Sequence, residues 1–114
     1  MNIANKTNSG SSASELKQAI WERLGQVEDP EIGLSITELG LIYSIEIDAE
    51  NNDKAKIEMT LTSMGCPYGP QLKAQVHAAA THIVAQVSVD VVFNPPWDPR
   101  KMASDEAKAL LGIY

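Results

Sequence analysis

The sequence predicts a small single domain of the α/β class (α+β in the stricter division), with the element order α-β-β-α-β-α. Two neighbouring segments in the middle of the chain alternate apolar and polar residues, which is the pattern of half-buried strands. A segment with helical spacing separates them from a third alternating segment, and such a connection usually returns the later strand parallel to a neighbour. We therefore expect a three-stranded mixed sheet packed with helices.

The length and composition fit one domain. The chain has 114 residues, of which 44% are hydrophobic, and this is enough to bury a core without a disulfide or a structural metal. Residues 1–13 are rich in Asn and Ser and have no apolar stretch like that of a secretory signal. We predict a flexible N-terminal tail over residues 1–13 and a folded domain over residues 14–114.

The first predicted helix covers residues 13–26. Ser12 and Glu15 form a capping-box pattern, in which each side chain accepts a hydrogen bond from the other residue's backbone N–H. Gly25 marks the end of this helix. Its apolar stripe consists of Leu16, Ile20, Leu24 and Val27.

The next segment, residues 27–40, is predicted to be a structured loop with one helical turn around Thr37, because Pro30 and two glycines interrupt it. Two strands, at residues 41–48 and 55–62, are expected to follow as a hairpin. The apolar face predicted for the first of these strands holds Leu41, Tyr43, Ile45 and Ile47.

The second half of the chain predicts a helix, a strand and a short last helix. Pro70 suits the first turn of a helix that runs to about residue 86, because its missing N–H costs nothing there. A third strand is predicted at residues 89–93, followed by a rigid proline-rich loop over residues 94–102. Ser104 is the expected N-cap of the last helix.

The charge and cysteine content narrow the class of partner. The formal net charge of −6 repels phosphate backbones and anionic lipids, and no basic stripe offsets it, so we expect neither nucleic acid nor a membrane as a partner. One cysteine cannot form an internal disulfide, which favours a reducing compartment and a cytoplasmic location.

Cys66 is the most informative residue of the chain. It lies between Gly65 and Pro67, just before the predicted second helix, where the helix N-terminus favours a negative charge. A thiolate there can attack electrophiles or bind a soft metal. The alternative is a small buried apolar residue, as many free cysteines are. Position alone leaves both interpretations open.

Three other residues are candidates for the same site. Asp29 and Glu31, in an acidic loop, can bind metal, hold a basic side chain of a partner or act as a base, but such carboxylates also occur in ordinary turns. Thr62 is predicted to end the second strand, beside Cys66, although a β-branched residue there also fits plain strand formation.

Other chemistry-bearing residues fit structural roles better. His77 and His82 are five residues apart, which does not match the i, i+4 spacing of a helical metal site, so we predict structural or surface positions. Trp97, held between prolines, can anchor a partner, but such a tryptophan more often plugs the edge of the core, and we expect that here. The sequence contains no P-loop, no GxGxxG and no CxxC pair.

Three segments, VEDPEIGLSITELGLIY, MTLTSMGCPYGP and VVFNPPWDPRKMASDEAKALLG, together resemble the metal–sulfur (iron–sulfur) cluster assembly factor family. This family includes SufT of the SUF system, PaaD and a eukaryotic cytosolic iron–sulfur targeting factor. The resemblance spans residues 15–112. It is nearest to stand-alone, SufT-like members, since the chain shows neither the cysteine-rich extension of PaaD-like members nor an ATPase domain.

The resemblance implies a set of site residues. The motif residues of the family fall on Asp29, Glu31, Thr62 and Cys66, which in the family gather around a small pocket. Glu38 stands where the family usually has aspartate, which keeps the charge and lengthens the side chain. The resemblance implies that these residues bind the cofactor and that Cys66 is the metal ligand.

The resemblance further implies a non-enzymatic factor that assembles or transfers iron–sulfur clusters during the maturation of client apoproteins, with the iron–sulfur assembly machinery as its partner. Because clusters usually need four protein ligands, a single Cys66 implies a labile cluster shared across a homodimer or completed by a partner. Two alternatives stay open: an adaptor that binds no metal, and a thiol-dependent enzyme.

Overall fold

The computed structural model describes residues 12–63 and 65–113. The predicted flexible tail lies outside these residues, except for its last two positions. The described elements are α1 (Ala13–Leu24), α2 (Ile36–Leu39), β1 (Ile42–Ile47), β2 (Lys54–Met59), α3 (Gly69–Ala80), β3 (Gln86–Val91), α4 (Pro99–Met102) and α5 (Asp105–Leu111).

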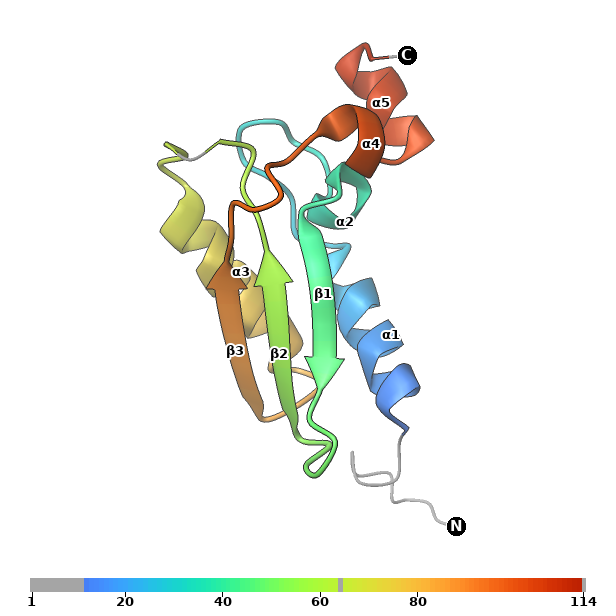
Figure 1. Cartoon of the computed structure of the whole chain (residues 1–114), viewed down its shortest axis with the longest axis vertical. Helices are drawn as coiled ribbons and strands as arrows, with labels where there is room; N and C mark the ends of the chain where they lie inside the picture. The colour runs from blue at the N-terminus through green and yellow to red at the C-terminus, as the bar shows by residue number, and fades with distance from the viewer. Residues whose placement is uncertain (1–11, 64, 114) are drawn as a thin grey trace.

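The three strands form one mixed sheet in the order β1-β2-β3 (Figure 1). β1 is antiparallel to β2, and β3 is parallel to β2. α1 and α3 pack against each other and cover one face of the sheet (Figure 1). The predicted fold class, the hairpin and the parallel return of the third strand are therefore confirmed.

The core lies between the sheet and this helix pair. The apolar stripe of α1 enters it, as do inward-facing residues of β2 and α3. Burying each such large side chain contributes about 1.5–3 kcal/mol relative to leaving it exposed. The largest apolar residues with almost no exposure are Ile20, Leu24, Ile36, Leu39, Leu41, Ile57, Met59, Leu72, Val76 and Val84.

Several predicted caps are confirmed. The Ser12–Glu15 capping box begins α1, although this helix ends at Leu24 and not at residue 26. The helical turn expected around Thr37 is α2. Ser104 caps α5, where its side chain accepts a hydrogen bond from the Ala107 N–H.

The end of the second long helix was predicted wrongly. α3 ends at Ala80, not near residue 86, and β3 already begins at Gln86. The turn between β1 and β2 explains this difference. The Asp53 carboxylate accepts a hydrogen bond from the Ala85 N–H at 2.9 Å, and the Asp53 carbonyl accepts one from the Gln86 N–H at 3.0 Å. These long-range bonds fix residues 85 and 86 to the turn between β1 and β2, and residues 81–83 form a turn where the local pattern favoured more helix.

The strict alternation predicted for the first strand is also wrong. The pairing of β1 with β2 shifts register between Ile42 and Ser44, which indicates a β-bulge at Tyr43. As a result Ile42 and Ile45 are both buried, whereas Tyr43 is only half-buried. The Tyr43 hydroxyl donates a hydrogen bond to the carbonyl of Pro95 at 2.7 Å.

The loop predicted over residues 94–102 contains a short helix, α4. Asp98 is its N-cap, accepting a hydrogen bond from the Arg100 N–H at 3.0 Å, and Pro99 occupies its first position. Trp97 packs against the core as expected, and its ring N–H donates to the Leu39 carbonyl at 2.7 Å. Within the described part of the chain, no helix is long and apolar enough to span a membrane.

Candidate functional site

Asp29 is fully buried in the loop between α1 and α2. Its Oδ1 accepts hydrogen bonds from the N–H groups of Glu31 at 2.8 Å and Ile32 at 3.1 Å. The Asp29 N–H donates to the Leu34 carbonyl at 2.9 Å, and the Gly33 N–H donates to the Asp29 carbonyl at 2.7 Å. Gly33 has a φ of 80°, a value that a residue with a side chain rarely adopts. The loop is thus built around this carboxylate.

The second oxygen of the same carboxylate, Asp29 Oδ2, is buried and has no hydrogen-bond partner among the described residues. Leaving a buried polar atom unpaired costs about 1–3 kcal/mol, and more for a charged group. Such an atom in a folded protein calls for an explanation, of which a ligand or a partner group is one. Sequence reasoning singled out Asp29 but not this unpaired oxygen.

Two threonine hydroxyls share this property. Thr60 is fully buried, Thr62 is half-buried, and neither Oγ1 has a hydrogen-bond partner among the described residues. The Thr60 N–H donates to the Leu41 carbonyl at 2.8 Å, so pairing continues one residue past β2. Thr62 was predicted to end this strand, which is wrong, because β2 ends at Met59. The sequence analysis did not name Thr60 as a site residue. The only feature that could have indicated it is its position two residues before Thr62.

Cys66 lies in the turn that leads from β2 into α3. Its N–H donates to the Ser63 carbonyl at 3.3 Å, and its carbonyl accepts from the Gly69 N–H at 3.2 Å. The residue is half-buried and packs against the core cluster. A β-carbon on Gly69 would lie 2.9 Å from a methyl group of Leu61, so the glycine lets the chain turn closely here. The thiol is therefore held between two turns at the rim of the core.

Both segments lie at the same end of the sheet (Figure 1). The loop of residues 25–35 and the segments of residues 60–63 and 65–68 lie where β2 ends, opposite the turn that joins β1 to β2 (Figure 1). Ile32 and Leu34 from the first segment and Cys66 from the second pack against the same core cluster. The fold thus brings the two predicted site segments to one end of the molecule.

The two glutamates of the predicted set are placed differently. Glu31 is exposed and contributes its backbone N–H to the Asp29 turn. Glu38, also exposed, accepts a hydrogen bond from the Ser104 hydroxyl at 2.6 Å, and its carbonyl accepts from the Ser104 N–H at 2.7 Å. The Glu38 side chain therefore ties α2 to the cap of α5.

The remaining candidates do not add a metal centre. His77 and His82 are both exposed, as predicted for surface residues. Among residues 12–63 and 65–113, no group of three or more His, Cys, Asp or Glu side chains is placed to hold a metal ion. Cys66 supplies the thiol at this end of the sheet, and the buried oxygens of Asp29, Thr60 and Thr62 are the hard donors there.

Relatives of known name resemble the chain over most of its length. The Fe–S protein maturation auxiliary factor YitW of Bacillus subtilis is 44% identical over 100 residues, covering 86% of this chain and 95% of the relative. The Fe–S protein maturation auxiliary factor SufT of Staphylococcus aureus is 43% identical over 89 residues, covering 76% and 98%. An iron–sulfur cluster carrier protein of Mycobacterium leprae is 32% identical over 90 residues, covering 79% of this chain but 23% of the relative.

The fold has a solved counterpart. The crystal structure of a domain of unknown function, DUF59, from Bacillus anthracis matches with a TM-score of 0.80 and 37% identity, covering 90% of this chain and 96% of the other. The family model described as iron–sulfur cluster assembly protein matches residues 17–91, from α1 to the end of β3. The chain belongs to the iron–sulfur cluster assembly protein family.

Proposed function

We propose that this protein assists the maturation of iron–sulfur proteins by assembling or transferring a cluster, with Cys66 as the thiolate that transiently binds cluster or metal. The observation that carries the proposal is the position of the chain's single thiol. Cys66 lies half-buried at the end of the sheet that also holds three buried oxygens without a hydrogen-bond partner among the described residues. The names of the relatives, maturation auxiliary factor and cluster carrier protein, support the same role.

We assign further roles to the buried oxygens at the same end of the sheet as Cys66. The unpaired Oδ2 of Asp29 accepts a hydrogen bond from a ligand or a partner, and the unpaired hydroxyls of Thr60 and Thr62 donate to sulfide or thiolate sulfur of the cargo. Glu31, which is exposed, contacts a basic group of a partner. Glu38 positions the site indirectly, because it holds α2 against the start of α5.

The ligand count favours a labile cluster. An iron–sulfur cluster usually takes four protein ligands, mostly thiolates, and each chain supplies one. The cluster is then completed by a second chain in a homodimer, or by a partner from the assembly machinery or the client apoprotein. Weak holding suits a protein that passes its cargo on. The free thiol fits the reducing environment of the cytoplasm, where we place this activity.

A thiol-dependent enzyme fits the structure less well. His77 lies eight residues into α3, about 12 Å along the helix axis from its start, and its side chain is exposed. A general base must be within hydrogen-bond reach of the sulfur that it activates. The other candidate base, Asp29, is fully buried and uses Oδ1 in its own turn, so we propose a non-catalytic role.

The test is anaerobic reconstitution of the purified protein with iron and sulfide, comparing wild type with Cys66→Ser. We expect a visible chromophore with less than one cluster per chain, eluting with a dimer or a partner, and its loss in Cys66→Ser. Asp90→Asn, on the open face of the sheet, is the matched control and should keep the chromophore. The carrier proposal is rejected if the wild type forms no chromophore and Cys66→Ser supports normal client maturation in cells. An adaptor that binds no metal would then be the better account.

A further inference from the structure

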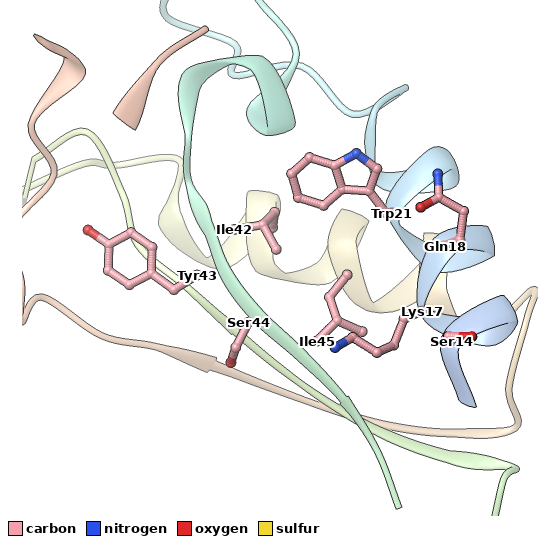
Figure 2. A pocket seen from close by; sticks show the side chains of 8 residues that line it. All are labelled: Ser14, Lys17, Gln18, Trp21, Ile42, Tyr43, Ser44 and Ile45. Carbon is pink, nitrogen blue, oxygen red and sulfur yellow. The ribbon is translucent and has the colours of Figure 1, made fainter. Parts of the chain in front are cut away.

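A groove of about 390 Å³ runs between α1 and β1, on a different part of the surface from the Cys66 turn (Figure 2). Ile42 and Ile45 form its apolar floor, and Lys17 and Trp21 from α1 form its wall. Trp21 is 40% exposed, one of two large apolar side chains exposed to this degree among the described residues. A partly exposed tryptophan beside an apolar floor is typical of a binding surface.

The groove borders an unpaired strand edge. Among residues 12–63 and 65–113, β1 is an outer strand of the sheet and pairs only with β2. The Asp48 N–H donates to the Lys54 carbonyl, and by antiparallel alternation the backbone groups of Glu46 and Ser44 also face β2. Those of Ile45 and Ile47 consequently point away from the sheet, where an extended peptide can pair with them.

The charge of the groove indicates what such a peptide carries. Lys17 is the one charged residue that lines it, and it makes no ion pair with any residue in the described ranges. Figure 2 shows its side chain reaching from α1 toward Ile45, while the Trp21 ring lies toward Ile42. This lone cation in a chain of net charge −6 favours a carboxylate on the occupant.

The spacing of the two wall residues matches a strand. Lys17 and Trp21 are four residues apart on α1, which is about 6 Å along the helix axis. Alternate residues of a strand, which share a face, lie about 6.8 Å apart. A strand added to β1 thus places one side chain on Trp21 and the next side chain of the same face at Lys17.

We propose that this groove binds an extended segment of another protein by strand addition to β1, with an acidic residue at Lys17 and a large apolar residue two positions later on Trp21. The order follows from antiparallel pairing, because β1 runs from the Trp21 end of the groove to the Lys17 end (Figure 2). The inference goes beyond the proposed function and does not rest on Cys66.

A second copy of this chain fits the groove less well. A partner β1 would share the faces of the sheet, and its acidic residue, Glu46, alternates with Ile45 and so lies on the face away from Lys17. The bulge between Ile42 and Ser44 also confines an added ladder to the second half of β1. The occupant is therefore a short foreign segment, whose affinity comes mainly from its two anchoring side chains.

The experiment titrates the isotope-labelled full chain with the capped peptide STETLTSG, in which Glu and Leu are two positions apart. We expect NMR shifts at the amides of Ile45 and Ile47 and at the indole of Trp21. The isomeric peptide STTELTSG, with Glu and Leu adjacent and therefore on opposite faces, should bind more weakly. Trp21→Ala should weaken binding roughly thirtyfold, as expected for an aromatic anchor.

Charge reversal gives the sharper test. Lys17→Glu should weaken the binding of STETLTSG about fivefold. The same variant should strengthen the binding of a peptide with Lys in place of Glu. Lys73→Glu, on α3 beside the other edge strand, is the matched control and should change neither peptide. The proposal is overturned if millimolar STETLTSG shifts no amide of β1, or if Lys17→Glu leaves both peptides unaffected. Concentration-dependent dimerisation that Trp21→Ala abolishes would overturn it in favour of a second copy.

Discussion

Asp29 and Asp48 lie at opposite ends of the molecule and make the same local turn. The Oδ1 of Asp29 accepts from backbone N–H groups two and three residues ahead, at 2.8 and 3.1 Å. The Oδ1 of Asp48 does the same, at 2.8 and 3.0 Å. The two carboxylates differ in how deeply they are buried. Asp48 is half-buried at the hairpin turn, whereas the Oδ2 of the fully buried Asp29 is unpaired among the described residues.

This difference separates a structural aspartate from a candidate functional one. Both side chains complete their turns with one oxygen, so the turn itself does not explain why Asp29 is buried with its second oxygen unpaired. At the hairpin end of the sheet, Asp53 accepts hydrogen bonds from the N–H groups of Ala85 and Gln86, which are 32 and 33 residues away in the sequence. The end that carries Cys66 holds the unpaired oxygens, as expected where a protein receives a ligand or a partner.

The largest expected effect separates the two aspartates by stability. Asp29→Ala removes the carboxylate that accepts hydrogen bonds from the part-buried N–H groups of Glu31 and Ile32, so we expect a loss of about 3 kcal/mol. Asp48→Ala removes the acceptor of the exposed Glu50 and Asn51 N–H groups, which water can replace, and should cost about 1 kcal/mol. Urea unfolding of both variants measures the difference. Equal losses would mean that burial does not distinguish the two turns.

The conservative change separates them by function. Asn keeps the accepting oxygen of the turn and replaces the unpaired oxygen by an amide donor, so Asp29→Asn should fold with nearly wild-type stability. We expect its cluster transfer to an apoprotein to fall about tenfold, as for residues that orient a metal ligand. Asp48→Asn should transfer normally. Normal transfer by Asp29→Asn would assign Asp29 a purely structural role.

The threonines extend the comparison to neutral groups. Thr60→Val replaces an unpaired buried hydroxyl by a methyl group of similar volume, so we expect a gain of about 1 kcal/mol together with slower cluster transfer. Thr81→Val is the control, because its hydroxyl donates to the Ala78 carbonyl at 2.9 Å and its removal should destabilise. Thermal unfolding reports the stabilities. A loss of stability in Thr60→Val would show that its hydroxyl has a partner in solution.

The smallest expected effect is a pH dependence of stability that comes from Glu15 in the first turn of α1. The Ser12 backbone N–H, and then its hydroxyl, hold the pKa of Glu15 below its ordinary value. A lowered folded pKa stabilises the protein above the unfolded pKa, and this stabilisation is lost as the pH falls through the folded value. Wild type should therefore exceed Glu15→Ala in unfolding midpoint at neutral pH, and the pH-dependent part of the gap should vanish in acid. If the difference in unfolding midpoint does not change with pH, the charge of Glu15 does not contribute to it.

Local signals predicted much of the fold. The Ser12–Glu15 capping box, the α2 turn and the Ser104 cap depend on residues within four positions of one another, and all three were predicted. The helix α4 was missed although Asp98 and Pro99 are a local start signal, because the neighbouring prolines favoured an irregular loop. For the candidate site, sequence and resemblance indicated Asp29 and Cys66, whereas the unpaired oxygen of Thr60 was visible only in the structure.

By itself the sequence determined the element types, the hairpin, the parallel return of the third strand and the family, because these follow from periodicity, caps and motifs that neighbouring residues carry. Tertiary structure alone decided the bulge at Tyr43, the early end of α3 and the burial of Asp29. In the first two, the deciding contacts join distant residues, such as Tyr43 with Pro95 and Asp53 with Ala85. Such contacts outweigh local preference because they form only once the core has brought both segments together.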